Sequence, residues 1–326
     1  MNRRNFIKKT SQAGTLAITG KTLLQSDDAV VSVGMIGLDT SHCPAFTKVI
    51  NAKDVAGEGT GFQVTHAYPH GSKDIETSVN RIEGYTQEMR DLGVAITDSI
   101  ESLLDHVDVV LLETNDGRLH FEQAELVIRA GKRLFIDKPI AASYADAAKI
   151  FQLASQNDVP IFSSSSLRFS PSMAAIKAGS LGEILGASTY SPAKLEPTHP
   201  DLFWYGVHGV ESLFTLMGTG CMSVQRSHTE DTDVVVGIWE DGRIGTFTGL
   251  RGGKTGYGGT AFGTEGIGEA GIYEGYEHLV KEILEFFRTG IPPVTAEETL
   301  EIFAFMQAAD LSKAEGGASI PLSRIK

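Results

Sequence analysis

Residues 30–165 alternate between short apolar runs and helical segments, and no other feature of the chain constrains its fold as strongly. The apolar runs, bounded by glycine, proline or polar residues, are typical of buried strands. These predicted strands occupy residues 30–37, 62–69, 94–96, 107–113, 133–137 and 159–166. The predicted helices occupy residues 43–53, 74–92, 99–106, 119–130 and 143–157. Because such alternation builds a parallel sheet with helices on both faces, we expect a doubly wound α/β domain.

The pattern changes after residue 166, where consecutive strands replace the alternation. Asp241-Gly242 separates two of these strands and is typical of a hairpin turn. The predicted strands occupy residues 222–228, 233–240, 243–250 and 257–265, and the predicted helices occupy residues 171–178, 206–217, 274–289 and 295–314. We therefore expect a parallel-sheet domain at residues 29–166 and an α+β domain with a mainly antiparallel sheet at residues 167–326.

The composition of the chain limits the kinds of molecule that it is expected to bind. The 326 residues carry a formal net charge of −13, from 28 basic and 41 acidic residues, without a basic tract. This balance argues against nucleic acid and against anionic membrane surfaces. No run approaches the ~18 consecutive apolar residues that a membrane-spanning helix needs. The two cysteines, Cys43 and Cys221, are too few for a disulfide framework or a cysteine-rich zinc cluster. A small molecule is the expected partner.

The first 28 residues resemble a targeting segment. Arg3 and Arg4 are adjacent, Phe6 follows them, and a weakly apolar stretch begins at Ala13. This pattern resembles a twin-arginine export signal, so we set residues 1–28 apart from the fold and expect export to the periplasm. The alternative is a flexible basic tail on a cytoplasmic protein.

The turn after the first strand departs from the dinucleotide-binding pattern G-x-G-x-x-G. Of its three glycines only Gly37 is present; Asp39 and His42 replace the others. A carboxylate there repels phosphate and a side chain fills its space, but Thr40, Ser41 and backbone amides can still donate hydrogen bonds. We assign Gly37, Asp39, Thr40, Ser41 and His42 to a cofactor site. The alternative is a turn that has lost nucleotide binding.

The second strand ends without the carboxylate that binds the adenosine ribose in NAD enzymes. His70, Ser72 and Lys73 stand there instead, a neutral-to-basic group that tolerates a ribose phosphate. We therefore leave NAD and NADP open as cofactors, with Ser72 as a contact. A plain loop is the alternative.

Lys138 carries the sharpest signal, because Asp137-Lys138-Pro139 follows the fifth strand. Ligands of open α/β sheets bind at this edge. A lysine there is a suitable acid–base group for oxidising a hydroxyl by hydride transfer.

With this motif, the chain resembles the glucose–fructose oxidoreductase / inositol dehydrogenase / MocA family over roughly residues 30–320. The family signature Glu-Lys-Pro is matched by Asp137-Lys138-Pro139, and the segments 167–169 and 261–266 are also similar. The resemblance implies a Rossmann domain, an antiparallel-sheet domain and a nicotinamide cofactor. It also implies a homo-oligomer formed through the second sheet.

A second family motif, Asp-x-Gly-x-His-x-x-Asp, is matched in part by residues 204–211. His208 is retained, Glu211 replaces the last aspartate, and Trp204 replaces the first. The resemblance implies that Lys138 and His208 face each other. The three-residue spacing places His208 and Glu211 on one helix face, where the carboxylate can hold the histidine. We predict Lys138, His208 and Glu211 as catalytic residues, and as substrate contacts Lys138, Arg168, Trp204, Tyr205 and His208.

The end of the fourth strand supplies further candidates. His120 matches a family histidine near the nicotinamide, and polar groups precede it. We assign Glu113, Asn115, His120 and Asp137 to the cofactor; helix capping by Asp116 is the alternative. We expect no metal, because the histidines near the cleft and Asp39 lack helix-type ligand spacing.

These assignments predict an oxidoreductase that uses a bound nicotinamide nucleotide on a sugar, cyclitol or glycoside hydroxyl. The alternative is a family member without nucleotide redox chemistry, acting as a carbohydrate-binding protein or a metal-dependent hydrolase or lyase.

Overall fold

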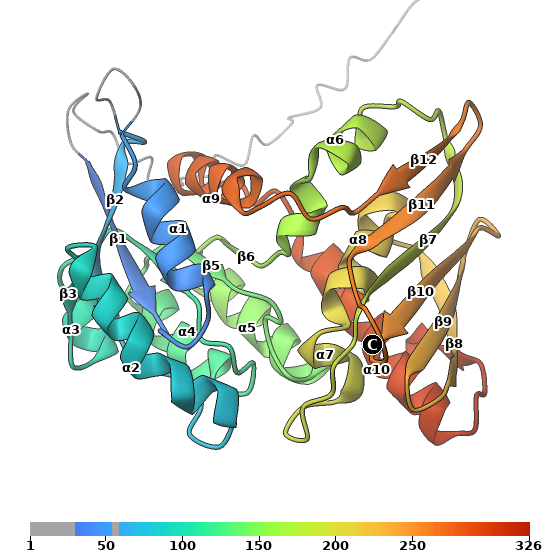
Figure 1. The fold of residues 1–326 in the computed structure, drawn as a ribbon, viewed down its shortest axis with the longest axis horizontal. Helices are drawn as coiled ribbons and strands as arrows, with labels where there is room; N and C mark the ends of the chain where they lie inside the picture. The colour runs from blue at the N-terminus through green and yellow to red at the C-terminus, as the bar shows by residue number, and fades with distance from the viewer. Residues whose placement is uncertain (1–29, 54–58) are drawn as a thin grey trace, which may run out of the picture.

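The computed structural model describes residues 30–53 and 59–326, and Figure 1 shows two sheets side by side. The predicted export signal lies outside the described residues. The first sheet is wholly parallel, with strand order β3-β2-β1-β4-β5-β6. Its strands are β1 (Val31–Ile36), β2 (Phe62–Tyr68), β3 (Ala95–Ile96), β4 (Val109–Leu112), β5 (Leu134–Ile136) and β6 (Ile161–Phe162). The strand order reverses direction between β1 and β4, so a ligand crevice is expected at the carboxyl ends of these two strands.

Helices cover both faces of this sheet, as the alternation predicted. They are α1 (His42–Ile50), α2 (Glu76–Asp91), α3 (Ile100–Leu104), α4 (His120–Arg129) and α5 (Tyr144–Gln156). The apolar residues of β4 are buried on both faces, and they divide between two core clusters. Val110 and Leu112 pack with α3, α4 and α5, whereas Val109 and Leu111 pack on the opposite side with α1. Ser143 caps α5 by accepting a hydrogen bond from Asp146 N.

The second sheet is mixed and mainly antiparallel, with strand order β12-β11-β7-β10-β9-β8-β13. Its strands are β7 (Ile184–Pro192), β8 (Cys221–His228), β9 (Thr232–Trp239), β10 (Ile244–Leu250), β11 (Gly258–Gly263), β12 (Ile267–Ala270) and β13 (Ile320–Pro321). Helices α8 (Val207–Met217) and α10 (Ala296–Ala314) pack against this sheet, while α6 (Pro171–Lys177) and α7 (Asp201–Trp204) are short. The predicted fold class is confirmed.

Strand β7 was not predicted, although it is central and pairs with both β10 and β11. Its sequence, ILGASTYSP, is rich in small residues and ends in proline, so it lacks the β-branched run that marks β9, TDVVVGIW. The predicted strand 159–166 is shorter in the structure. It ends at Phe162, because the serines after it turn towards the second domain and lead into a 3₁₀ helix, η1 (Ser166–Phe169).

Helix α9 (Glu277–Thr289) returns from the second half of the chain to the first sheet. Its Ile283 and Phe287 belong to the same core cluster as Phe46 of α1 and Phe135 of β5. Arg133 also donates a hydrogen bond to the Phe287 carbonyl oxygen, at 2.5 Å. One face of the parallel sheet is therefore completed by residues beyond position 167. Within residues 30–53 and 59–326, no helix is both long and apolar enough to span a bilayer.

Candidate active site between the two sheets

A cleft of about 300 Å³ lies at the carboxyl edge of the first sheet and faces α8. Such a volume is at the lower end of the range of small-molecule sites. Eight of the residues predicted for the site line it: Thr40, Ser41, His42, Asn115, Lys138, Trp204, Tyr205 and His208. The structure thus brings the loops after β1, β4 and β5 together with α7 and α8.

Lys138 is held at the cleft by the residue before it. The Lys138 backbone N–H donates to Asp137 Oδ1 at 2.8 Å, and the Lys138 Nζ lies 3.6 Å from Asp137 Oδ2. The lysine side chain is 12 % exposed, so it reaches the cleft without being freely solvated. The peptide bond to Pro139 is cis.

His208 shares the cleft with Lys138. Its Nδ1 lies 2.8 Å from the Ser165 hydroxyl, which leaves Nε2 as the nitrogen available to a ligand. Burial, together with the charge of Lys138, lowers the pKa of His208 well below its usual range. The ring is therefore neutral at pH 7 and can accept a proton.

The predicted contact between Glu211 and His208 is wrong. Glu211 accepts hydrogen bonds from the Ser164 hydroxyl at 2.5 Å and the Ser165 backbone N–H at 2.8 Å, and it pairs with Arg168 at 2.8 Å. The two residues do lie near one another along α8, but Ser165 stands between them and contacts both. Glu211 is therefore a positioning residue for His208 rather than its direct partner.

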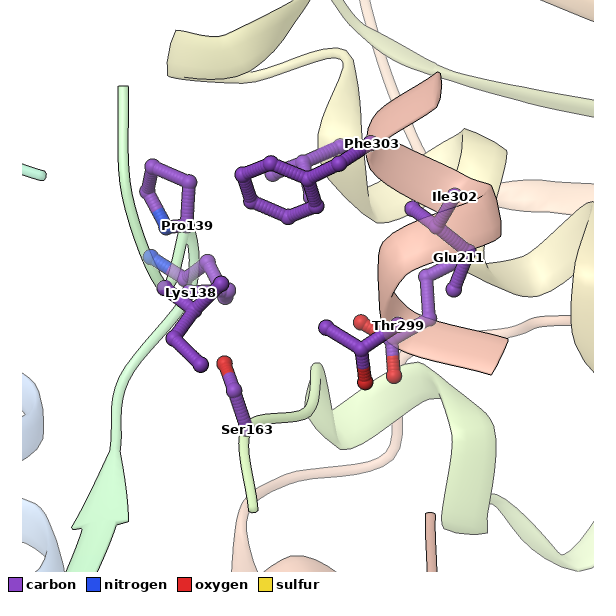
Figure 2. A pocket seen from close by; sticks show the side chains of 9 residues that line it. Lys138, Pro139, Ser163, Glu211, Thr299, Ile302 and Phe303 are labelled. Carbon is purple, nitrogen blue, oxygen red and sulfur yellow. The ribbon is translucent and has the colours of Figure 1, made fainter. Parts of the chain in front are cut away.

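Glu211 also lines a small cavity of about 10 Å³ behind Lys138 (Figure 2). Ser163 and Thr299 contribute hydroxyls to the same cavity. This is about the space that one water molecule needs, and the lining supplies polar partners for it. The lysine stem and the buried carboxylate thus border one small cavity, whose other lining residues are mainly apolar.

Arg168 does not line the cleft, which corrects its predicted role as a substrate contact. Its side chain is 2 % exposed and pairs with Glu211 and, at 2.6 Å, with Glu298. Its Nε and Nη1 pair with these two carboxylates, while Nη2 is buried and makes no hydrogen bond, so Arg168 stabilises the domain interior instead of reaching a substrate.

Asp39 is turned away from the cleft and does not oppose a phosphate there. Its carboxylate accepts from the Asn115 backbone N–H at 2.9 Å and from the Ser78 hydroxyl. Burial raises the pKa of Asp39, against the effect of these hydrogen bonds. The predicted role in cofactor binding is therefore replaced by a structural one, in which Asp39 joins the loops after β1 and β4 to α2.

Gly37 allows the loops after β1 and β4 to approach each other closely. It has φ of 89°, and a Cβ at this position would lie 2.3 Å from the Thr114 backbone nitrogen. No other residue type fits both constraints. Gly37 thus shapes the crevice without facing it.

Two further predicted cofactor contacts do not reach the cleft. His120 is fully buried, and its ring nitrogens contact the carbonyl oxygens of Thr114 and Ile140 at 2.6 and 3.2 Å. The histidine at this position therefore links two loops instead of contacting a ligand in the cleft. Ser72 lines a separate cavity of about 390 Å³, together with Asp74 and Arg118.

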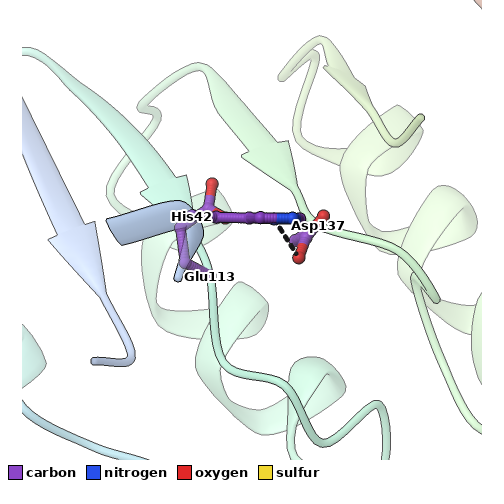
Figure 3. Close-up of side chains that lie close together, drawn as sticks. All are labelled: His42, Glu113 and Asp137. Atoms are coloured by element: carbon purple, nitrogen blue, oxygen red, sulfur yellow. Dashed lines mark ion pairs between the residues drawn. The ribbon is translucent and has the colours of Figure 1, made fainter. Parts of the chain in front are cut away.

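His42, Glu113 and Asp137 form a buried cluster at the ends of β4 and β5 (Figure 3). His42 Nδ1 lies 2.8 Å from Asp137 Oδ2 and 3.5 Å from Glu113 Oε2. Only His42 also lines the cleft. The predicted assignment of Glu113 and Asp137 as direct cofactor contacts is therefore wrong for this arrangement, because both carboxylates lie beneath the cleft.

Sequence reasoning missed several residues that line the cleft: Arg81, Tyr85, Tyr257, Tyr273 and Tyr276. Tyr85 lies within the predicted helix 74–92, whose range alone does not show which side chains reach the cleft. The last three lie around a glycine-rich stretch without a clear periodicity, although the concentration of tyrosines there was a usable signal.

The residues of the cleft fit a nicotinamide nucleotide. Thr40 and Ser41 lie at the N-terminus of α1, where backbone N–H groups and the helix dipole favour phosphate. Ser41 makes no side-chain capping hydrogen bond, so its hydroxyl is not committed to the helix. Arg81 contributes a cation from α2, and Asn115 and Lys138 line the same space.

Comparison with known proteins agrees with this geometry. The family model described as "Oxidoreductase family, NAD-binding Rossmann fold" matches residues 31–165. An uncharacterised oxidoreductase of Escherichia coli, YhhX, is 28% identical over 138 residues, which are 38% of this chain and 40% of that protein. The match thus spans less than half the length of this relative.

Solved structures extend the similarity of the fold to both domains. The scyllo-inositol dehydrogenase of Lactobacillus casei, solved with NAD(H) and scyllo-inositol, has a TM-score of 0.70 and 14% identity, covering 90% of this chain and 99% of that one. A probable dehydrogenase of Thermotoga maritima has a TM-score of 0.71 and 20% identity, covering 91% and 100%. GenD2 from gentamicin A biosynthesis, solved with NAD, has a TM-score of 0.71 and 17% identity, covering 90% and 96%. Residues 31–165 are thus similar to the NAD-binding Rossmann domain of the Gfo/Idh/MocA oxidoreductase family, and the fold of the whole chain is similar to that of solved dehydrogenases.

Proposed function

We propose that the protein is an oxidoreductase that uses NAD or NADP to oxidise or reduce a hydroxyl of a sugar, cyclitol or glycoside. The observation that carries this proposal is the presence of Lys138 and a neutral His208 in one cleft, at the carboxyl edge of a parallel sheet. A hydroxyl that loses hydride must also lose a proton, and these residues are suited to that proton transfer.

The chain's own residues account for proton transfer and for binding of the substrate. Lys138 donates a charge-assisted hydrogen bond to the substrate oxygen, which stabilises negative charge on it. His208 accepts the proton at Nε2, while Ser165 holds Nδ1. A bound nicotinamide nucleotide supplies the acceptor or donor of the hydride.

The aromatic lining favours a carbohydrate-like substrate. Trp204, Tyr205, Tyr257, Tyr273 and Tyr276 all face the cleft. Aromatic faces pack against the C–H surface of a sugar ring, while phenols form hydrogen bonds with its hydroxyls. Burial raises the pKa of Tyr257 to about 12, so its phenol stays protonated and can donate. The scyllo-inositol bound to the similar dehydrogenase belongs to the same chemical class.

Replacing Lys138 tests the proposed function. We expect Lys138→Met to reduce turnover of the true substrate by at least about 100-fold, the scale of a lost acid–base group. Substrates come from a panel of sugars, cyclitols and glycosides, with NAD and NADP each supplied and absorbance at 340 nm recorded. Lys149→Met, an exposed lysine on α5, is the matched control and should keep full activity.

A second measurement addresses the nucleotide directly. Mass spectrometry of the denatured protein, and titration of the native protein with NAD and NADP, should detect binding of at least one of them. Absence of binding and of turnover with both would overturn the proposal in favour of a protein without nucleotide redox chemistry.

We also propose a homo-oligomer formed through the second sheet. The face of this sheet away from α8 and α10 carries exposed apolar side chains on adjacent strands: Tyr190, Val234, Ile238, Ile244 and Phe262. Ile238 and Ile244 are paired in register across β9 and β10, so they form one continuous patch. Light scattering should give a dimer or larger assembly, and Ile238→Lys should yield monomers.

We further propose export by the twin-arginine route, supported by the adjacent Arg3 and Arg4. Cell fractionation of the wild-type protein and of a variant carrying Arg3→Lys and Arg4→Lys tests this. If both proteins stay in the cytoplasm, a cytoplasmic dehydrogenase with a dissociable cofactor is the better description.

A further inference from the structure

The proposed reaction gives the cluster of His42, Glu113 and Asp137 no part in proton transfer, yet three separate elements build it. His42 is the first residue of α1, Glu113 follows β4, and Asp137 follows β5. The carboxyl ends of neighbouring parallel strands meet at one edge, so the three side chains converge. Glu113 and Asp137 are 0% exposed and His42 is 8% exposed.

Four polar atoms of this cluster lack hydrogen-bond partners, while Asp137 Oδ1 accepts from the Lys138 backbone N–H. Both carboxylate oxygens of Glu113, Asp137 Oδ2 and His42 Nδ1 are buried and make no hydrogen bond of acceptable geometry. Figure 3 shows the His42 ring edge-on, with the contact to Asp137 leaving the ring plane, where the ring N–H does not point. Burying such groups without partners is costly, which indicates a missing positive species between them.

The spacing of the ligand atoms matches a metal coordination sphere. With metal–ligand bonds of roughly 2.1 Å, neighbouring ligand atoms are about 3.0 Å apart in an octahedron and about 3.4 Å apart in a tetrahedron. The distances from His42 Nδ1 are 2.8 Å to Asp137 and 3.5 Å to Glu113. One available atom from each residue lies within 4.8 Å of the others. Small side-chain adjustments suffice for all three atoms to contact one ion.

We propose that His42, Glu113 and Asp137 bind one divalent transition-metal ion, such as zinc or manganese, beneath the floor of the cleft. One imidazole nitrogen and two carboxylates suit these ions better than magnesium or calcium, which take oxygen ligands alone. The ion links the start of α1 to the ends of β4 and β5. Its binding does not depend on the proposed oxidoreductase activity.

Charge neutrality is consistent with such an ion. Two ionised carboxylates and a neutral imidazole balance a doubly charged cation. The Lys138 Nζ lies 3.6 Å from Asp137 Oδ2. With the ion bound, this ammonium group is available to a ligand in the cleft and is not needed to neutralise the two carboxylates. The competing arrangement has no metal, and a protonated His42 and Lys138 share the two carboxylates.

The test uses the full chain, stripped of metal with a chelator and then titrated with zinc chloride without nucleotide. We expect one zinc per chain, measured by elemental mass spectrometry after gel filtration, and a rise in melting temperature. Glu113→Gln should weaken zinc binding more than about 100-fold, because losing even an outer-shell partner costs 10- to 100-fold. Glu301→Gln removes a buried carboxylate of the second domain, where it accepts from the backbone N–H groups of Gly220 and Cys221, and should leave zinc binding unchanged.

Zinc binding that is absent from the folded wild type, or equal in wild type and Glu113→Gln, overturns the proposal. If Glu113→Gln does not fold, wild-type crystals soaked in zinc decide the question. Anomalous scattering should place one zinc ion about 2.0–2.2 Å from an atom of each of the three residues. No peak at that position contradicts the site. Since no nucleotide or substrate is present, failure here is separate from failure of the proposed activity.

Discussion

Two buried clusters of charge lie next to residues that line the cleft. Their carboxylates differ in the number of hydrogen bonds that they accept. In the second domain, Glu211 receives hydrogen bonds from Ser164, the backbone of Ser165 and Arg168. In the first domain, neither oxygen of Glu113 has a hydrogen-bond partner. Both glutamates are almost fully buried, so the contrast does not reflect a difference in exposure.

The comparison separates groups that hold the fold from groups available to a ligand. A carboxylate that already accepts several hydrogen bonds has little left to offer, and Glu211 positions its neighbours. A carboxylate buried without partners is unstable until something binds it or protonates it. The two clusters therefore respond differently to mutation.

The largest expected loss of stability comes from replacing Arg168, the buried cation that pairs with Glu211. Arg168→Met leaves Glu211 without its buried cation, so we expect a loss of about 3–5 kcal/mol of unfolding free energy. Urea denaturation followed by circular dichroism measures it. Arg129→Met is the control, because Arg129 pairs with Glu125 on the surface and is 61% exposed. That substitution should cost under ~1 kcal/mol. Similar losses in both variants would mean that the Arg168 cluster does not stabilise the domain.

The fold of the first domain was predictable because its central strands are continuous apolar runs. Such strands are buried on both faces, so their sequence signal is strong. Strand β7 was not predictable in this way, since Gly186, Ala187 and Ser188 have low strand propensity and are placed by the strands on either side.

The site was predictable where chain position alone decides it. Lys138 follows a strand at the ligand edge, and His208 lies in a motif, so their location in the cleft could be predicted, while their catalytic roles stay predictions. The partner of Glu211 was not, because spacing along a helix identifies a shared face but not the residue opposite it. The direction of Asp39 also depends on a distant residue, Ser78 of α2, which no local pattern reveals.

Asp116 is a third buried carboxylate, and it lies in the same loop after β4 as Glu113. It accepts hydrogen bonds from Arg118 Nε at 2.9 Å and from Arg118 N at 3.0 Å, and His199 Nε2 lies 3.3 Å away. Burial alone would raise the pKa of Asp116, but His199 and Arg118 outweigh it and hold the pKa well below its usual range. We expect Asp116→Asn to cost about 1.5–3 kcal/mol at pH 7, the scale of hydrogen bonds to a charged group.

The pH dependence of this loss follows from the lowered pKa. A carboxyl whose pKa is lower in the folded state stabilises it above the unfolded value of about 3.9, and this contribution disappears as pH falls. The difference between wild type and Asp116→Asn should therefore be constant above about pH 5 and shrink below pH 4. Asp74→Asn is the control, since Asp74 binds the same Arg118 but is 59% exposed. A difference that does not change with pH would refute a role for the ionised Asp116.

The smallest effect on stability is expected at Ser165, which contacts both Glu211 and His208 of the cleft. Its hydroxyl contacts His208 Nδ1 and its backbone N–H donates to Glu211, so the serine connects the buried carboxylate to the ring that we propose accepts the proton. Ser165→Ala keeps the backbone contact and should change the unfolding free energy by less than ~1.5 kcal/mol. It removes the hydroxyl that selects the tautomer of His208. Nitrogen-15 shifts of the ring should then report a mixture of tautomers, and turnover should fall by about tenfold with little change in KM. Ser164→Ala removes a neighbouring hydroxyl that contacts Glu211 but not His208, so it should leave the ring nitrogens unchanged. If both variants alter the His208 shifts equally, the buried cluster acts on the cleft through general packing. The Ser165 hydroxyl then does not select the tautomer of His208.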